Sequence, residues 1–293
     1  MPILSVTFRL TLSRPVEFQS FSGFTSRGIF YELVRLHDEE YAQALHSSKR
    51  LSPFSTWPLF SVRNGRLRFA YKRLEGPTAY ARINVLDPGL SNVVIGVITS
   101  GLSEIRCVKE SLPIAEVSVE QVDFRDLVSR ASPVKAFSVN FMTPCYFRAT
   151  PRTMSEVFPS KTRRAGDTGP YRFLPLPVPT LIFRSLVRIW RAFSDRPLSY
   201  KGFLEWVEAG GVAISGFPKG IRTIRVYEHP TTNKWAVGFL GTVRFSIPED
   251  TYSEKYAAIV DILLRFAEYS NVGGNRTAGF GVIKYKPMAK EGG

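Results

Sequence analysis

The sequence predicts an α+β fold made of two ferredoxin-like domains in tandem, each with the element order β-α-β-β-α-β. Two observations support this prediction. Strand and helix patterns alternate in that order through the first half of the chain, and the order starts again after a polar stretch over residues 125–133. The length of 293 residues also suits two domains of about 150 residues each. We therefore expect an N-terminal domain over residues 1–128 and a C-terminal domain over residues 129–293.

Apolar spacing and a capping residue specify the first strand and the two helices after it. Residues 3–12 alternate apolar and polar side chains, which is typical of a strand. Residues 21–36 lead into a helix with apolar side chains at helical spacing. Asp38 is placed to cap a second, short helix that ends at Leu45. A polar, serine-rich loop begins at His46.

An Asn64-Gly65 pair predicts a β-hairpin, because this dipeptide is the strongest short turn signal between two strands. On the second strand of that hairpin, three basic residues share one face: Arg66, Arg68 and Lys72. The other expected elements of this half are a strand, a helix that opens at Asp87-Pro88, and two further strands, over residues 79–86, 87–100, 104–109 and 114–121.

The C-terminal half repeats the order with different element lengths. Alternating prolines over residues 175–179 impose an extended path into a helix. The expected elements are a strand, two helices, a hairpin, a last helix and a last strand, over residues 134–142, 180–193, 200–209, 221–228, 234–247, 251–268 and 282–285. Thr251 and Glu254 have the spacing of a capping box at the start of the last helix. Asp261 and Arg265 are expected on the side of this helix opposite its apolar stripe, as an ion pair.

A glycine-rich segment, GGNRTAGFG, lies between the last helix and the last strand. Glycine permits positive φ angles and close approach of backbone amides to an anion, and arginine adds donors that suit a phosphate. The segment therefore predicts anion contact by Gly273, Gly274, Asn275, Arg276, Gly279, Phe280 and Gly281.

The net charge of +14 and the pI near 9.9 indicate a polyanion partner. Residues 1–130 carry 16 basic and 13 acidic residues, a net +3, so the remaining +11 belongs to residues 131–293. We expect the following basic residues of the second half to contact that partner: Lys161, Arg163 and Arg164 in a loop, Arg184 and Arg188 on a helix, and Arg222 and Arg225 on a strand.

The composition also excludes several classes of protein. No run of 18 or more apolar residues is present, so no membrane span is expected. Cys107 and Cys145 are the only cysteines, which excludes a disulfide scaffold, and no Cys/His cluster has the spacing of a zinc site. A cytoplasmic location is the default expectation.

Candidate chemistry is limited by the few carboxylates and histidines. The only acidic cluster, Asp38-Glu39-Glu40, begins a helix, where acids are favourable anyway, so we expect no metal and no other cofactor. RNA cleavage without a metal needs a base for the 2′-OH, an acid for the 5′-oxygen, and cations near the phosphate. Histidine suits the proton transfers. Of the three histidines, His37 ends a helix and His229 precedes a proline, which leaves His46 as the candidate.

A basic chain that ends in a helix, GGNRTAGFG and a short strand resembles the RAMP superfamily of CRISPR proteins. Within it, the chain is most similar to the endoribonuclease that cuts CRISPR precursor RNA. The resemblance implies a catalytic histidine in the N-terminal domain, with a tyrosine from the preceding helix and a downstream lysine. Tyr31 and His46 match, whereas Ser52 stands near the lysine position, so Lys49 or Arg50 would substitute.

The resemblance implies CRISPR repeat RNA as the partner and a product with a 2′,3′-cyclic phosphate. One alternative is a non-catalytic RAMP subunit that binds guide RNA among other effector-complex subunits, and a homodimer is a further expectation. A plain RRM is the third interpretation, because residues 278–285 partly match the RNP1 pattern. RNP1 belongs on a middle strand, whereas this segment ends the fold, which favours the RAMP interpretation.

Overall fold

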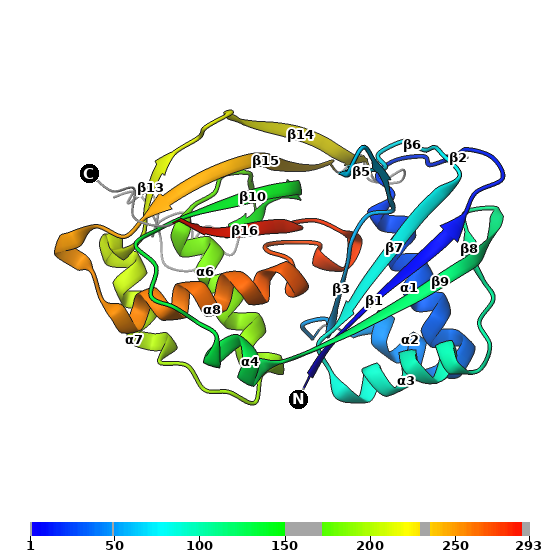
Figure 1. The fold of residues 1–293 in the computed structure, drawn as a ribbon, viewed down its shortest axis with the longest axis horizontal. Coiled ribbons are helices and arrows are strands. Elements are labelled where there is room, and N and C mark those ends of the chain that lie inside the picture. The colour runs from blue at the N-terminus through cyan, green and yellow to red at the C-terminus, as the bar shows by residue number, and fades with distance from the viewer. Residues whose placement is uncertain (1, 49, 150–171, 229–234, 289–293) are drawn as a thin grey trace, which may run out of the picture.

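The computed structural model describes residues 2–48, 50–149, 172–228 and 235–288. Figure 1 shows two lobes side by side, each a β-sheet with its helices packed on it, and the chain passes from the first lobe to the second near α4. No helix in these four ranges is long and apolar enough to cross a membrane.

The first lobe is built on an antiparallel sheet with the order β5-β4-β7-β1-β9-β8, and β3 also pairs with β7. The central strand β1 lies between β7 and β9, as a ferredoxin-like fold requires. The strands of the sheet are β1 (Pro2–Thr11), β3 (Phe54–Thr56), β4 (Phe60–Arg63), β5 (Arg66–Phe69), β7 (Thr78–Val85), β8 (Glu104–Cys107) and β9 (Glu110–Asp123).

Three helices complete the first lobe: α1 (Gly23–His37), α2 (Glu39–Ser47) and α3 (Pro88–Thr99). Asp38 caps α2 as predicted, since its side chain accepts a hydrogen bond from the Tyr41 amide at 2.9 Å. Two short strands, β2 (Val16–Glu17) and β6 (Arg73–Leu74), pair with each other outside the main sheet.

The second lobe repeats this topology in the order β13-β15-β10-β16, with β14 also paired to β15. The strands are β10 (Ala136–Cys145), β13 (Ala213–Gly216), β14 (Ile221–Glu228), β15 (Trp235–Ser246) and β16 (Ile283–Met288). The helices are α4 (Phe124–Ser129), which connects the lobes, α6 (Pro179–Phe193), α7 (Tyr200–Trp206) and α8 (Glu254–Ser270), with short turns η1 (Val207–Gly211), η2 (Glu249–Thr251) and η3 (Arg276–Ala278). A separate pair is formed by β11 (Phe147–Ala149) and β12 (Arg172–Leu174).

The predicted fold class is confirmed: the chain is an α+β protein, and both of its large sheets have a ferredoxin-like strand order. The division at residues 128 and 129 stays a prediction. Two local predictions about the last helix are wrong. Ser253, not Thr251, caps α8, because Pro248 draws Thr251 into the turn η2.

The second wrong prediction concerns Asp261, which is fully buried instead of lying on the solvent side of α8. Its carboxylate accepts hydrogen bonds from the Tyr285 hydroxyl at 2.7 Å and from the Ser132 amide at 3.0 Å. The predicted ion pair with Arg265 does form, at 2.8 Å. A buried carboxylate needs such partners, and sequence spacing on one helix does not show donors that come from distant segments.

Aromatic clusters join the two lobes around the glycine-rich segment. Phe21 of the first lobe packs edge-on against Phe280, whose ring also meets Tyr146 of the second lobe. In a second cluster, Trp57 and Phe60 of the first lobe pack with Val282. The glycine-rich segment therefore lies at the interface, where it contacts both sheets.

Candidate functional site

A basic cleft of about 490 Å³ lies between the lobes. The second lobe contributes α6, the segment 273–277, Phe147 and Arg148 to the lining of the cleft. The first lobe contributes residues 50–52. The lining contains five arginines and no acidic residue: Arg50, Arg148, Arg184, Arg188 and Arg276. The cleft has the charge and the shape to hold a polyanion.

The helix α6 brings two predicted residues into this cleft. Its apolar side is buried against α8 and the second sheet, which turns Arg184 and Arg188 toward the opening. Arg184 also forms an ion pair with Glu208 at 2.9 Å, whereas Arg188 is exposed. Arg188 is therefore the residue of α6 with the most accessible charge in the cleft.

Arg276 has a different main role from the one predicted. It is 94% buried, and it donates hydrogen bonds to the backbone oxygens of Ser270 at 2.7 Å and Ser52 at 3.0 Å. Burial lowers the pKa of its guanidinium to about 10, with the charge of Arg188 adding to the effect, so it stays protonated at neutral pH. Because Ser52 belongs to the first lobe, Arg276 fastens the loop after α2 to the glycine-rich segment.

The first two glycines form the wall of the cleft with amides that are already bonded. The Gly273 amide donates to Ser185 Oγ at 3.2 Å, and the Gly274 amide donates to the Tyr146 carbonyl at 2.9 Å. A Cβ at Gly274 would meet the Tyr146 ring at 2.5 Å. The Gly273 and Gly274 amides were predicted to bind an anion, but both already donate hydrogen bonds within the protein. The two residues form a wall of the cleft instead.

Gly279, Phe280 and Gly281 lie inside the protein, which leaves them without a surface to offer RNA. Gly279 and Gly281 have positive φ angles of 71° and 66°, and a Cβ at Gly281 would overlap the Val272 carbonyl oxygen. These glycines permit close packing of the segment between the lobes. The predicted RNA contact by these three residues is corrected accordingly.

Tyr31 and His46 lie together, as the family pattern implies. Their ring centroids are 5.0 Å apart in an edge-on contact, with His46 exposed in the last turn of α2 and Tyr31 half-buried on α1. Burial raises the pKa of the Tyr31 hydroxyl, and the nearby Arg27 opposes that shift. Four residues after His46 the chain reaches Arg50, which is exposed and lines the cleft.

The other predicted residues fall elsewhere. Lys49, Lys161, Arg163, Arg164 and His229 lie outside the described residues. Arg222 and Arg225 are exposed on β14, and neither lines the cleft.

His37 lies against α3, where it approaches Gly96, and not beside Tyr31. Its exclusion from the candidate site stays a prediction.

Sequence reasoning missed Arg148 and Ser185, which both line the cleft. Arg148 lies in the short strand β11, and Ser185 is a single hydroxyl among the arginines of α6. Neither belongs to a motif, so only the spatial arrangement reveals them.

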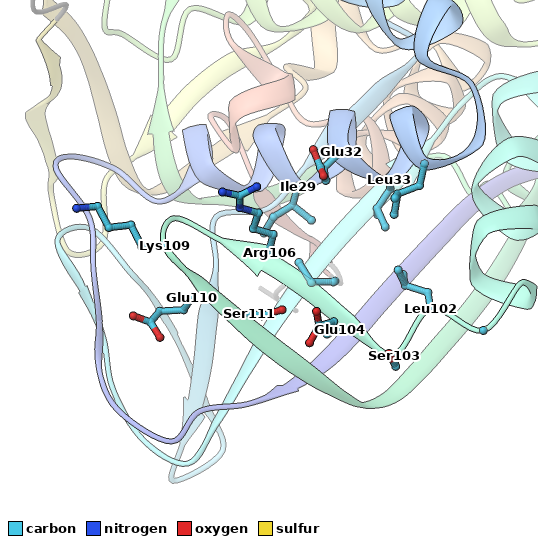
Figure 2. A pocket seen from close by; sticks show the side chains of 13 residues that line it. Ile29, Glu32, Leu33, Leu102, Ser103, Glu104, Arg106, Lys109, Glu110 and Ser111 are labelled. Atoms are coloured by element: carbon cyan, nitrogen blue, oxygen red, sulfur yellow. The ribbon is translucent and has the colours of Figure 1, made fainter.

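A second hollow, of about 550 Å³, separates α1 from the β8–β9 hairpin, and Figure 2 shows its charged side chains. Glu32, Glu104 and Glu110 outnumber Arg106 and Lys109 there, so it does not suit a polyanion. In the part of the chain that the structure describes, no three His, Cys, Asp or Glu side chains gather as metal ligands would.

Comparisons with known proteins agree with this architecture. Residues 139–283 match the family model described as CRISPR-associated endoribonuclease Cas6. The chain is similar to the product complex of a Cas6 protein, with a TM-score of 0.73 and 21% identity over 98% of this chain and 99% of that one. It is also similar to Thermus thermophilus Cas6, with a TM-score of 0.67 and 23% identity over 97% and 98% of the two chains. A Cas6-related protein from Pyrococcus furiosus has a TM-score of 0.57 and 13% identity over 100% of both. No curated protein sequence matches the chain.

The chain pairs two ferredoxin-like lobes with a glycine-rich segment between them, which is the architecture that the sequence resemblance implied. Residues 139–283 match the Cas6 family model, and the fold of the whole chain is similar to that of the Cas6 structures.

Proposed function

We propose that this protein cleaves CRISPR precursor RNA within its repeats, without a metal ion, through attack of the 2′-OH at the scissile nucleotide. The observation that carries the proposal is the contact between exposed His46 and half-buried Tyr31, close in sequence to Arg50 of the arginine-lined cleft. Two of the similar Cas6 structures are a product complex and a substrate-mimic complex, which supports an RNA substrate.

His46 is proposed as the base that takes the proton of the 2′-OH, because its imidazole is exposed at the end of α2. The 2′-oxygen then bonds to phosphorus, the bond from phosphorus to the 5′-oxygen breaks, and the leaving oxygen takes a proton from water. The hydroxide that remains takes the proton held by His46, which restores the neutral imidazole. The products are a 2′,3′-cyclic phosphate and a 5′-hydroxyl. Each step balances without a metal or cofactor.

Tyr31 and Arg50 are proposed to stabilise the negative charge that gathers on the phosphate. The raised pKa of Tyr31 keeps its hydroxyl protonated, so Tyr31 acts as a hydrogen-bond donor and not as a base. Arg50 is exposed and lines the cleft, where its charge can stabilise the phosphate. Lys49, the preceding residue in the sequence, stays a candidate for the same role.

The division of labour follows the two lobes. The proposed N-terminal domain, residues 1–128, contributes the reacting groups, while the proposed C-terminal domain, residues 129–293, contributes α6 and the glycine-rich wall. Arg188, Arg184, Arg148 and Asn275 then contact RNA phosphates, with Arg276 holding the wall in place.

The test is cleavage of repeat RNA by purified protein in excess EDTA. We expect an unchanged rate and a product that ends in a 2′,3′-cyclic phosphate or its monophosphate hydrolysis product. An RNA with hydrogen in place of the scissile 2′-OH should bind normally and resist cleavage. Cleavage of that deoxy RNA would refute the mechanism, and tight binding of intact RNA without cleavage would instead identify a non-catalytic RAMP subunit.

A further inference from the structure

The β4–β5 hairpin carries another basic hollow, of about 680 Å³, that shares no lining residue with the cleft. Its charged lining consists of four arginines and one acid: Arg63, Arg66, Arg68, Arg73 and Glu75. The net charge of this lining is +3, equal to the net charge of all residues 1–130. The hollow alone therefore carries a net charge as large as that of the whole first half of the chain.

The strand register holds these charges together. Arg63 pairs directly opposite Arg66, and Arg68 pairs opposite Ser61 on the same face of the ribbon. Like charges directly opposite each other destabilise a strand pair. A tight Asn64-Gly65 turn, with φ angles of 51° and 70°, fixes this arrangement. An anionic ligand between the guanidinium groups would remove the repulsion.

The single acid neutralises only part of the hollow. Glu75 lies 3.0 Å from Arg73 and 3.5 Å from Arg63, so those two arginines share one carboxylate. Arg66 and Arg68 are exposed and form no ion pair within the described ranges. They stand two residues apart on one strand, about 7 Å along the ribbon, which is of the order of the separation between neighbouring phosphates of one nucleic-acid strand.

A positive charge on a strand of the second lobe acts on the residue that follows the hollow in sequence. Tyr71 follows Ala70, which lines the hollow, and the charge of Arg222 on β14 acts on the Tyr71 hydroxyl. Burial is the larger influence and raises the pKa of Tyr71 to about 12, while Arg222 opposes it. Arg222, which lies outside the cleft, is therefore near enough to Tyr71 for its charge to act on the residue that follows the hollow in sequence.

We propose that the arginine hollow of the β4–β5 hairpin binds the sugar-phosphate backbone of a segment of precursor RNA that lies outside the cleft. The inference rests on the proposed function, since it needs an RNA substrate longer than the cleft accommodates. Guanidinium groups favour phosphate because their donors match two of its oxygens. The hollow would then raise affinity for long precursors without taking part in cleavage.

The experiment compares two RNAs and two double variants. One RNA is a repeat flanked on both sides by spacer sequence, and the other is the shortest fragment of that repeat that the wild-type protein still cuts. The first double variant, Arg66→Ala with Arg68→Ala, removes the two arginines of the hollow that form no ion pair within the described ranges. Arg125→Ala with Arg130→Ala is the matched control, because it removes the same charge from exposed residues on and after α4.

The hollow variant should bind the long RNA roughly tenfold to a hundredfold more weakly at moderate salt, while its affinity for the short RNA changes less than about twofold. Its plot of log affinity against log salt for the long RNA should become shallower by about 1.4, the value for two single-strand phosphate contacts. Cleavage of bound short RNA should keep its rate. The control variant should show much smaller changes with both RNAs.

An unchanged affinity of the hollow variant for the long RNA would overturn the proposal. An equal loss on both RNAs, matched by the control variant, would also overturn it, because a general electrostatic field would then explain the result. Failure of the wild-type protein to bind or cut either RNA would instead refute the proposed function, so the two failures are distinguishable.

Discussion

The two sides of the cleft are built in opposite ways. On the first-lobe side, Arg50 is exposed and lines the cleft, and His46 is exposed four residues earlier at the end of α2. On the second-lobe side, Arg276 is buried between backbone carbonyls, and the glycine amides are bonded to neighbouring segments. The glycine-rich segment looks like a ligand-binding motif in the sequence, but its groups are hydrogen-bonded within the protein. The first-lobe residues, which belong to no strong motif, have exposed side chains.

This contrast suggests how the two sides divide the work. Arg276, Thr56 and Asn271 link the lobes through hydrogen bonds of 2.9–3.0 Å, so the glycine-rich wall would fix the position of an RNA backbone in the proposed function. Exposed groups opposite that wall remain able to exchange protons with substrate and solvent. We therefore expect substitutions on the first-lobe side to change cleavage, and substitutions in the wall to change stability.

The largest expected effect is that of His46→Ala. If His46 transfers a proton in the transition state, its loss should slow single-turnover cleavage of repeat RNA by about 10²- to 10⁴-fold. Affinity for the RNA should hardly change, because the arginines of the cleft supply the phosphate contacts. His37→Ala is the matched control, since His37 is also exposed but lies against α3, and it should cut at the wild-type rate. Near-normal cleavage by His46→Ala would move the reaction to Tyr31, Arg50 and Lys49.

Arg276→Ala tests the other side of the comparison. Removing this side chain leaves the Ser270 and Ser52 carbonyls without their donors and opens a cavity, so the free energy of unfolding should fall by about 3 kcal/mol. Denaturant unfolding would measure this loss. Arg188→Ala is the contrasting variant, because Arg188 is exposed in the same cleft and its loss should weaken RNA binding with little change in stability. If Arg276→Ala kept full stability and lost only RNA affinity, the wall would be a binding element after all.

Much of the fold could be predicted because local signals agreed with it. The Asn64-Gly65 turn, the Asp38 cap and the strand alternation each depend on a few neighbouring residues, and all appear in the structure. The burial of Asp261 and Arg276 could not be predicted in the same way. Their partners are Ser132, Tyr285 and Ser52, which belong to other segments of the chain. The spacing of apolar residues along a single helix does not predict such contacts.

The candidate site shows the same limit. The contact between Tyr31 and His46 was expected from the family pattern, and the rings do meet. The glycine-rich segment was expected to bind an anion as a whole, but half of it is buried. Glycines needed for close packing and glycines needed for phosphate contact have the same sequence signature, because both rest on the missing Cβ.

The smallest expected effect is that of Tyr31→Phe, which removes one hydroxyl and keeps the ring against His46. As a neutral hydrogen-bond donor, the hydroxyl should be worth about 0.5–1.5 kcal/mol, so cleavage should slow by roughly twofold to tenfold. Because burial raises the pKa of Tyr31, the wild-type hydroxyl keeps its proton at neutral and mildly alkaline pH, and Tyr31→Phe should leave the shape of the rate profile unchanged between about pH 6 and 9.

Tyr31→Ala is the contrasting variant for this last prediction. It removes the ring that packs on His46, so the end of α2 loses a contact and the rate should fall further than in Tyr31→Phe. A loss in Tyr31→Phe as large as in His46→Ala, together with a missing alkaline limb in its pH profile, would show that Tyr31 is a proton-transfer group. The first lobe would then contribute two reacting residues instead of one residue and its hydrogen-bond donor.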